Sequence, residues 1–524
     1  MADKELPAAL FGDEKIPSFL RHLQEATRAT PDASASRYIP PSGGEIADSN
    51  YHHFVFGQRG SGKSSLLRHL EAQMQDEGRA SAWLDQEVFS NLNYPDVLVS
   101  AVHGLMAGVL AATRTAHPAP KVATPPWWQR CINVIVRNPP PPISHEQAVI
   151  SALSGIVDQL TRLKFAPLDR KIEWTIVEEA NDTSSFSAGA KLEVVTAGAQ
   201  VESGSRSSAT RTEVVEGSKE QYLERALTNF REVLGQAASL VSGGFIFVDD
   251  LYQLRRSDQP LVLGYLHRLV KDTGFWLKIG SIRYSTVPFR PGDPPRGMQP
   301  GHDAHEVPLD RGLRYFTSTQ TFLESILTGI ASTSGVSIQA LFTEDSRKRL
   351  VLAAGGVARD YLRLASGAVA EARNRGVTTK PGSHRVIVED VNKAAGGLSP
   401  TKFTDLREDE PDEAAELERL VRQLTEFCRT TKAAYFLVAA DDTALSTQVN
   451  KLQHLRFAHL LAESETIPNR GSQRFNVWLL DVAELSAQRA TQGMDFLGWE
   501  SREKRRNRKL IFSPTDRTEQ VEQI

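Results

Sequence analysis

The sequence contains few cysteines and no long apolar run. Only Cys131 and Cys428 occur among 524 residues, which excludes a disulfide-stapled scaffold and suits a reducing compartment. No apolar run approaches the roughly 18 residues needed to cross a bilayer. Met1–Leu10 carries three charged residues before a short apolar stretch, unlike a secretory signal. We therefore expect a soluble, cytoplasmic protein without a membrane partner.

A strong excess of charge of one sign is also missing. The formal net charge is -3, so the molecule does not bind polyanions through bulk charge, and any nucleic-acid surface must be a local patch. The balance of 40% hydrophobic and 24% charged residues is typical of globular proteins. The length predicts two to four folded units.

One motif in the chain has a specific chemistry. A short apolar run ending at Phe56 predicts a buried strand, and the apolar stripe after Ser65 predicts a helix. The segment between them matches G-x-x-x-x-G-K-[ST] in full, and a strand–turn–helix context is the one this motif requires. Its residues, which we predict to bind the nucleotide together with Ser65, are Gly57, Gln58, Arg59, Gly60, Ser61, Gly62, Lys63 and Ser64.

Each part of the motif has a physical role. Glycines permit positive φ angles and let backbone N–H groups close on phosphate oxygens. The helix N-terminus adds a partial positive charge. We expect Lys63 to bridge the β- and γ-phosphates and the Ser64 hydroxyl to ligate Mg²⁺. The predicted cofactors are therefore ATP and Mg²⁺.

A second strand ends in two carboxylates. The apolar run from Gly243 to Val248 is typical of a central parallel strand, and Asp249 and Asp250 follow it. We expect Asp249 to hold Mg²⁺ through its water shell and Asp250 to polarise the attacking water. A third strand, Phe275–Ser281, precedes Arg283, and ligands bind beyond the carboxyl ends of parallel strands. Arg283 is therefore a candidate phosphate sensor.

The order of these motifs resembles the Orc1/Cdc6-type AAA+ and STAND ATPases over roughly residues 37–400. Gly355-Gly356-Val357-Ala358-Arg359 is similar to the start of the sensor-2 lid helix of Orc/Cdc6 proteins. The resemblance implies that Arg359 contacts the γ-phosphate. It also implies an α/β P-loop NTPase fold, in which a parallel sheet is combined with a helical lid, an inserted β-rich segment and a C-terminal winged-helix-like domain.

The chain departs from the Orc/Cdc6 pattern at one residue. Orc/Cdc6 proteins normally have Asp-Glu where this chain has Asp249-Asp250, and Asp-Asp looks more like the STAND switch ATPases. Because Asp250 is one methylene shorter than Glu, we expect slow hydrolysis. Three arginines stay open as a trans-acting arginine finger: Arg268, Arg311 and Arg314.

The predicted domain organisation follows from these landmarks. Its parts are an N-terminal extension (1–50), a P-loop ATPase core (51–318) with an insert (114–219), a helical lid (319–400), an acidic linker (401–414), a winged-helix-like domain (415–490) and a basic tail (491–524). Within the insert we predict a helix over Glu146–Leu163 and strands over Lys171–Glu178, Lys191–Val201 and Arg211–Val215. The insert is either a partner-binding projection or a loop without a role.

The C-terminal region predicts helices over Ala415–Thr430 and Thr443–Leu461 and a strand over Phe475–Leu480. By resemblance this is a winged helix, which serves either to bind double-stranded DNA or to contact protein. Candidate DNA contacts are Gln448, Lys451, His454, Arg456, Arg470 and Arg474. The basic run Arg502–Lys509 either attracts polyanions or only aids solubility.

Two functions are consistent with these features. The first is an ATP-dependent switch, in which ATP binding and slow hydrolysis control homo-oligomerisation, or the binding of DNA or a protein partner. The alternative is a static ATP-binding adaptor without significant turnover, which the Asp250 departure and the large insert favour.

Overall fold

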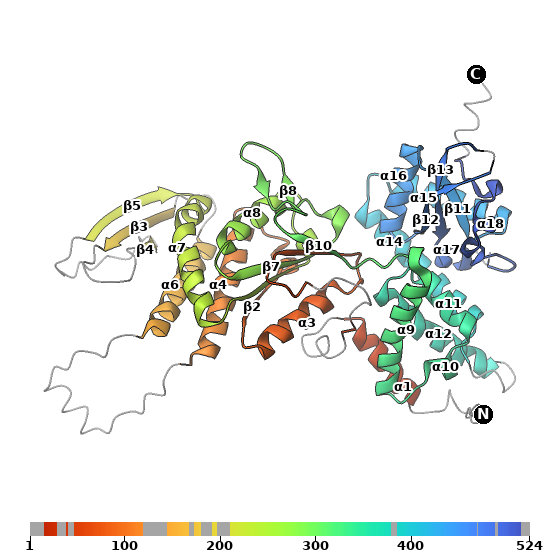
Figure 1. The fold of residues 1–524 in the computed structure, drawn as a ribbon, viewed down its shortest axis with the longest axis horizontal. Coiled ribbons are helices and arrows are strands. Elements are labelled where there is room, and N and C mark those ends of the chain that lie inside the picture. Colours follow the sequence, from red (N-terminus) through yellow and green to blue (C-terminus); the bar gives the residue numbers. More distant parts are fainter. Residues whose placement is uncertain are drawn as a thin grey trace, which may run out of the picture. The chain divides into compact units, whose positions relative to one another are not determined.

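The computed structural model describes most of the chain (Figure 1), namely residues 15–28, 38–39, 47–118, 144–166, 172–179, 191–195, 210–378, 385–468, 470–487 and 491–514. These residues form two compact units. The sheet unit comprises residues 45–57 and 63–308. The lid unit comprises residues 1–44, 58–62 and 309–524.

A parallel five-stranded sheet forms the centre of the sheet unit. Its strands lie in the order β10 (His305–Pro308), β1 (His53–Phe56), β7 (Phe275–Ser281), β6 (Gly244–Asp249) and β2 (Ala80–Asp85). β1 and β6 are buried along their whole length, as expected for central strands of a parallel sheet. β7 lies between β1, the strand before the P-loop, and β6, the strand that ends at Asp249, so a single strand separates these two. The predicted P-loop ATPase fold is confirmed.

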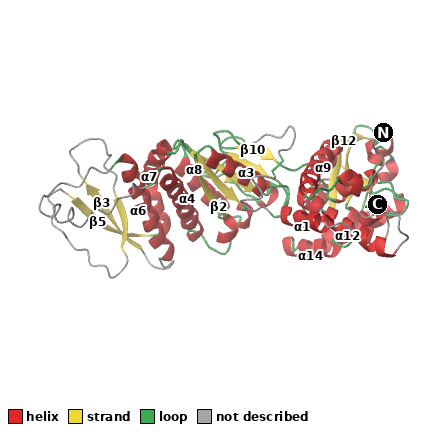
Figure 2. Cartoon of the chain, turned by 90° about the horizontal axis from the view of Figure 1, so that it is seen from below, coloured by secondary structure: helices red, strands yellow, loops and turns green. Residues whose placement is uncertain are grey.

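Helices cover both faces of this sheet (Figure 2), and their bounds are α3 (Lys63–Asp76), α4 (Asp96–Ala116), α6 (His145–Phe165), α7 (Lys219–Leu240) and α8 (Gln259–Val270). α3 packs on β2, β6 and β7, while α4 packs on β2 and α8 on β7 through alternate residues of the strands. Gly104 and Gly108 of α4 face Leu84 and Ala82, so α4 approaches β2 closely. α6 and α7 pack against α4 and complete the layer.

α4 has the length and composition of a membrane-crossing helix, which the sequence analysis did not recognise. Of its most apolar window, 61% is buried within the protein. Val102, Leu105, Met106 and Val109 are fully buried in the same core cluster as residues of α6, α7 and α8. α4 is therefore a core helix of this unit in the structure.

The predicted insert contains one element of the core and one small sheet. α6 packs on α4 and α7, so it belongs to the helical layer. An antiparallel sheet follows in the order β4 (Lys191–Val195), β3 (Ile172–Glu179) and β5 (Thr210–Gly217). The strands predicted over Lys171–Glu178 and Arg211–Val215 lie within two residues of β3 and β5. Of the strand predicted over Lys191–Val201, residues 191–195 form β4, and residues 196–201 lie outside the described residues. α7 then begins with a capping box between Ser218 and Gln221.

Several short elements connect these parts in the sheet unit. They are the 3₁₀ helices η1 (Gln86–Phe89), η2 (Leu251–Gln253) and η3 (Arg283–Ser285) and the strands β8 (Phe289–Arg290) and β9 (Arg296–Gly297).

The lid unit begins with a bundle of helices. Their bounds are α1 (Lys15–Ala26), η4 (Leu313–Tyr315), α9 (Phe316–Thr333), α10 (Ile338–Leu341), α11 (Glu344–Ala353), α12 (Ala358–Thr378), α13 (Val388–Gly396) and α14 (Ser399–Asp409). α1 buries Ile16, Phe19 and Leu23 against α9 and α12, so the N-terminal extension contributes to the lid core. The predicted acidic linker starts inside α14.

The C-terminal module, residues 414–514, contains a three-stranded antiparallel sheet of order β11–β13–β12. Its elements are α15 (Ala414–Thr431), β11 (Tyr435–Ala439), α16 (Thr443–His454), β12 (Ala458–Thr466), β13 (Arg474–Leu480), α17 (Val482–Ala487), η5 (Gly498–Glu500), α18 (Arg502–Arg505) and η6 (Arg508–Leu510). Its buried residues belong to the same core cluster as those of the lid helices.

The helix predicted over Thr443–Leu461 is wrong in its second half. α16 ends at His454, and Arg456 takes a left-handed conformation with φ of 64°. Ala458–Thr466 then pairs with β13 as strand β12. Between β11 and β12, a stretch that the structure describes throughout, there is one helix, and β11 separates α15 from α16. A helix-turn-helix is not formed there, and the winged-helix assignment is not confirmed.

Candidate functional site

The P-loop joins β1 to α3 as the motif requires. Gly60 and Gly62 have φ angles of 91° and 98°, a conformation that favours glycine, whereas Gly57 has no positive φ. The Gly57 N–H donates to the Ser281 carbonyl at 3.2 Å, which fixes the start of the turn to β7. α3 begins at Lys63, so its N-terminus provides the partial positive charge of an anion site.

Lys63, Ser64 and Asp249 come together at the carboxyl ends of β1 and β6. Lys63 is buried, and its Nζ donates to the Gly57 carbonyl at 2.9 Å. Burial and the neighbouring charge of Asp250 raise the pKa of Asp249 to about 6, while the hydrogen bond from Ser64 and the charge of Lys63 oppose this rise. The structure therefore brings together the Lys63 ammonium, the Ser64 hydroxyl and the Asp249 carboxylate.

Asp250 lies in a left-handed conformation at the end of β6. Its φ and ψ are 52° and 42°, and its N–H donates to the Asp249 carboxylate at 3.0 Å. A left-handed aspartate is uncommon and is found most often in turns and at functional sites. The backbone thus separates the directions of the two carboxylates.

Gly280 is a site residue that the sequence analysis missed. A Cβ atom added to Gly280 would lie 2.9 Å from the Asp249 Oδ1 atom and 3.0 Å from Leu67. The neighbouring strand β7 therefore leaves room for the Asp249 carboxylate only because residue 280 has no side chain. A glycine inside an apolar strand indicates a close approach and was the available signal.

The donor set fits a magnesium-bound nucleoside triphosphate. Ser64 and Asp249 present a hydroxyl and a carboxylate, the oxygen ligands that Mg²⁺ prefers. Within the described residues, the buried Ser61 hydroxyl has no hydrogen-bond partner. An unsatisfied buried hydroxyl in a phosphate-binding turn is accounted for if a ligand completes it.

Arg283 is held by protein groups in this structure. Its guanidinium forms an ion pair with Glu306 of β10 and lies 4.5 Å from the ring of Phe56. Ser281, at the end of β7, is buried and shares a 2.5 Å hydrogen bond with Thr286. A sensor role for Arg283 stays a prediction that requires release from Glu306.

Arg359 contacts the P-loop turn through its backbone. Its N–H donates to the Gly60 carbonyl at 3.2 Å, and a Cβ added to Gly60 would lie 2.8 Å from the Arg359 Cβ. Both residues belong to the lid unit, and the Arg359 side chain is exposed. In the same unit, the Asp310 carboxylate accepts a hydrogen bond from the Gln58 N–H at 2.7 Å.

Comparison with known families identifies the segment that carries the P-loop. Residues 22–95 match the family model described as ORC-CDC6-like. Over these residues the chain is similar to ORC-CDC6-like proteins. The resemblance predicted from the motifs is confirmed there, although the match spans a minor part of the chain.

Two solved structures are similar to this chain over most of its length. The Walker-type ATPase PABY2304 of Pyrococcus abyssi has 10% identity and a TM-score of 0.37, with 90% of this chain and 94% of that chain covered. Cdc6p from Pyrobaculum aerophilum has 12% identity and a TM-score of 0.29, with 93% and 98% covered. No curated protein matches the chain.

Of the three candidate arginine fingers, two form ion pairs within their own unit. Arg268 binds Glu224 through both terminal nitrogens, at 2.9 and 2.6 Å. Arg314 lies 2.9 Å from Glu463. Burial lowers the pKa of Arg311. The identity of a finger is not decided by these contacts.

Four of the candidate DNA contacts are engaged inside the lid unit. Gln448 of α16 binds Glu416 of α15, and Lys451 of α16 binds Glu413, the residue before α15, at 2.6 Å. Burial lowers the pKa of His454, and Arg456 is paired with two carboxylates. Arg470 and Arg474 are exposed. DNA recognition through α16 would therefore require these contacts to break.

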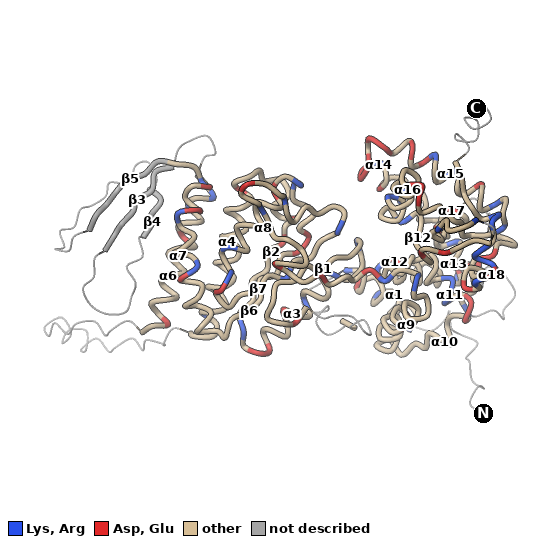
Figure 3. Tube along the Cα trace, turned by 45° about the horizontal axis from the view of Figure 1, so that its top comes forward, with Lys and Arg blue, Asp and Glu red and all other residues tan. Residues whose placement is uncertain are grey.

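The basic tail packs on the C-terminal module. Lys and Arg gather around α18 (Figure 3), but Arg505 pairs with Glu465 at 2.8 Å and Arg506 donates to Thr466. The Phe512 N–H donates to the Leu437 carbonyl at 2.9 Å. The basic run Arg502–Lys509 is therefore part of the folded module, and residues 515–524 lie outside the described part.

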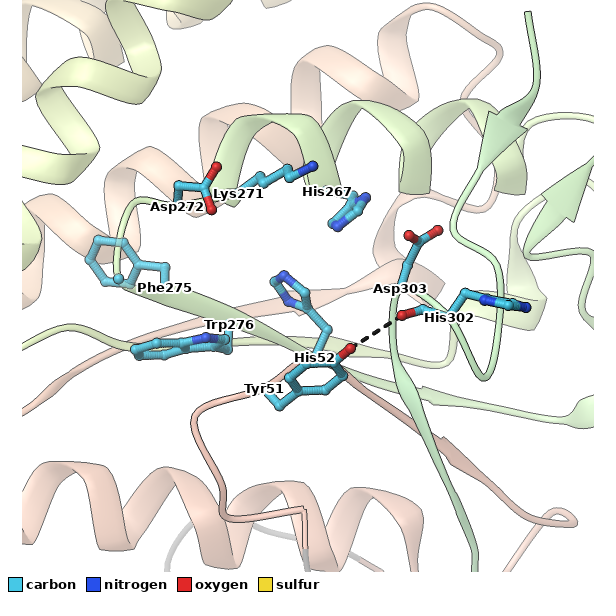
Figure 4. A pocket seen from close by; sticks show the side chains of 10 residues that line it. Tyr51, His52, His267, Lys271, Asp272, Phe275, Trp276, His302 and Asp303 are labelled. Carbon is cyan, nitrogen blue, oxygen red and sulfur yellow. Dashed lines mark hydrogen bonds between the residues drawn. The ribbon is translucent and has the colours of Figure 1, made fainter.

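A separate hollow of about 440 Å³ lies at the amino ends of the strands, opposite the P-loop (Figure 4). His52 and His267 point toward one another there, with ring centroids 5.1 Å apart. His52 Nδ1 accepts the Leu277 N–H at 2.9 Å, as a structural histidine does. Among the described residues, no group of three or more His, Cys, Asp or Glu could hold a metal ion.

Proposed function

We propose that this chain is an ATP-dependent molecular switch, in which ATP binding and slow hydrolysis control self-association and the binding of duplex DNA or a protein partner. The buried cluster of Lys63, Ser64 and Asp249 carries this proposal. Lys63 and the α3 N-terminus bind and orient the triphosphate, and Ser64 and Asp249 hold Mg²⁺. When bound, Mg²⁺ neutralises negative charge on the phosphates.

Asp250 supports slow turnover. A carboxylate at this position orients and polarises the attacking water, and Asp250 reaches one methylene less far than a glutamate would. A static ATP-binding adaptor is the second candidate, and the same short side chain favours it. Arg359, whose backbone contacts Gly60, is the proposed sensor of the γ-phosphate.

The test measures particle mass and ATP hydrolysis with ATP, ADP or a non-hydrolysable analogue, each with and without duplex DNA. We expect ATP and the analogue to change the mass, and Lys63→Ala to abolish nucleotide binding. Asp250→Ala should keep binding and the ATP-dependent mass but lose on the order of a hundredfold in turnover, the lower end of the usual contribution of an acid–base group.

Each alternative has its own result. Normal nucleotide binding by Lys63→Ala would refute the site. An unchanged mass together with turnover that Asp250→Ala does not alter would leave the adaptor. A mass change that occurs without DNA, and no retention of DNA at low salt, would restrict the switch to protein partners.

A further inference from the structure

The start of α12 contacts the P-loop turn and the C-terminal module at the same time, within the lid unit. On one side, Arg359 donates its N–H to Gly60 at 3.2 Å. On the other side, the next residue, Asp360, is almost fully buried and accepts hydrogen bonds from Arg456 at 3.0 and 3.3 Å. Two successive residues of one helix therefore connect the nucleotide loop to the C-terminal module.

Arg456 is held in place from three directions. Its second terminal nitrogen donates to Asp405 at 3.1 Å. Its carbonyl accepts a hydrogen bond from Lys402 at 3.1 Å. A guanidinium that binds two carboxylates has a defined orientation, because its donors are rigidly arranged.

The backbone of Arg456 has an unfavourable conformation for an arginine. With φ of 64° it occupies the left-handed position after α16, where Phe457 donates back to Leu452 at 2.8 Å. Glycine is the usual residue at this position of a helix end. The two ion pairs of the Arg456 side chain, with Asp360 and Asp405, act against this backbone strain.

The loop before α12 rests on the same module. A Cβ added to Gly355 would lie 2.1 Å from the His459 ring, so the ring packs directly on the glycine. His459 binds the fully buried Asp481 at 3.0 Å, and Lys402 binds the same carboxylate at 2.8 Å. Although burial alone would raise it, Lys402 and His459 lower the pKa of Asp481 to about 2. The network of Lys402, His459 and Asp481 therefore supports the loop that contains Gly355.

We propose that Arg456 is a positioning residue for the nucleotide site, which holds Arg359 against the P-loop through Asp360 and thereby sets the preference for ATP over ADP. The inference rests on the proposed function, in which Arg359 senses the γ-phosphate. Coupling is reciprocal, so a partner that moves the C-terminal module changes nucleotide preference, and ATP changes the affinity for that partner.

The experiment compares two pairs of variants in the full chain. Asp360→Asn and Asp405→Asn each remove one carboxylate from Arg456, but only Asp360 adjoins Arg359. Arg456→Gly removes the side chain and relieves the left-handed strain, whereas Arg456→Lys keeps the charge. ATP and ADP affinities are measured by calorimetry, and folding is followed by thermal melting.

We expect Asp360→Asn and Arg456→Gly to reduce the ATP-over-ADP preference roughly tenfold, a common size for coupling between sites. Asp405→Asn should stay within about twofold, and Arg456→Lys should recover part of the loss. The melting temperature of Arg456→Gly should lie within a few degrees of that of the parent protein, because the relieved strain offsets the lost ion pairs. A structural defect alone would lower stability and both affinities together.

A double variant separates this inference from the proposed function. If Arg456 acts through Arg359, then Arg359→Ala with Arg456→Gly has the same preference as Arg359→Ala alone. Two outcomes overturn this inference only. In the first, the effects of the two substitutions on the ATP-over-ADP preference add up. In the second, Arg359→Ala loses the preference while Asp360→Asn and Arg456→Gly keep it. A normal preference in Arg359→Ala overturns the sensor role and this inference together, and normal binding by Lys63→Ala refutes the site itself.

Discussion

The burial of Asp249 in the proposed nucleotide site lowers the free energy of unfolding of the protein. Its carboxylate is 6% exposed and its pKa is raised to about 6, from an ordinary value of 3.8. An acid whose pKa is raised by folding costs free energy whenever it is ionised. Above pH 6 this cost is about 3 kcal/mol, at 1.36 kcal/mol per pKa unit. In the proposed function, the Mg²⁺ ion that binds with ATP offsets this cost.

We therefore predict that Asp249→Asn stabilises the nucleotide-free protein at pH 8 by up to about 3 kcal/mol and has little effect at pH 4. The sign follows because the cost is absent below the unfolded pKa, grows between pH 3.8 and 6, and is complete above that range. Urea denaturation at the two pH values measures it. Equal destabilisation at both would contradict the explanation, and Asp250→Asn, which removes only the neighbouring charge, should give a smaller gain at pH 8.

The sequence predicts which residues lie together where chemistry and local context coincide. The P-loop residues have a fixed spacing, and Asp249 follows a strongly apolar run, so their meeting could be foreseen. Gly280 could not be recognised, because its role depends on the distance between β6 and β7. Arg283 was assigned without knowledge of Glu306, a residue of β10 that only the folded sheet brings close.

At the scale of elements, the amino edge of the sheet depends on neutral histidines. Burial lowers the pKa of His52 and His53 to about 4, and the charge of Lys278 contributes to both shifts. Lys278, itself buried in β7, donates to the Ser49 and Tyr51 carbonyls at 2.7 and 3.0 Å. The turn that leads into β1 is thus held by groups that cannot all be protonated.

We predict that this edge makes the protein acid-labile. The unfolded histidines bind protons near pH 6.5 and the folded ones near pH 4, so their contribution is full above pH 6.5 and is lost as the pH falls toward 4. His52→Asn keeps a hydrogen-bond acceptor for Leu277 but cannot titrate. Between pH 6.5 and 4.5 its unfolding free energy should fall less steeply than that of the parent protein. The two slopes should differ by up to about 1.4 kcal/mol per pH unit. The exposed His145→Asn serves as the control, and an unchanged slope in His52→Asn would refute the account.

The elements that the sequence predicted poorly are those determined by distant partners. β10 has four residues of mixed polarity and is a strand because it pairs with β1. The apolar spacing through Leu455 and Leu461 continues a helical pattern, yet Ala458–Thr466 pairs with β13. In contrast, α12 begins at Ala358, two residues after the second of the two glycines on which the lid-helix resemblance was based.

At the scale of the whole molecule, the lid helices and the C-terminal module share one hydrophobic core. Phe19 of α1, Leu323 of α9, Tyr361 of α12 and Leu479 of β13 are all fully buried in the same cluster. The acidic linker expected between two separate domains is instead partly α14, and Arg407 of this helix pairs with Glu418 of α15. The described parts of the lid unit should therefore fold as one cooperative unit.

Hydrogen exchange in increasing urea tests this expectation. We predict that amides of α12 and β13 lose protection at the same urea concentration. Leu479→Ala, a core truncation that costs about 2–5 kcal/mol, should weaken protection in α12 as much as in β13. The sheet unit serves as the internal control. Loss confined to β11–β13, with α12 unchanged, would show that the C-terminal module is an independent domain.

The apolar helix α4 has a consequence for the synthesis of this chain. Its packing partners α6, α7 and α8 all come later in the sequence, so the ribosome releases α4 before the helices that cover it have been made. During this interval the nascent chain exposes a segment that is long and apolar enough for a membrane. The order of translation, as well as the final fold, therefore determines how long this apolar segment stays uncovered.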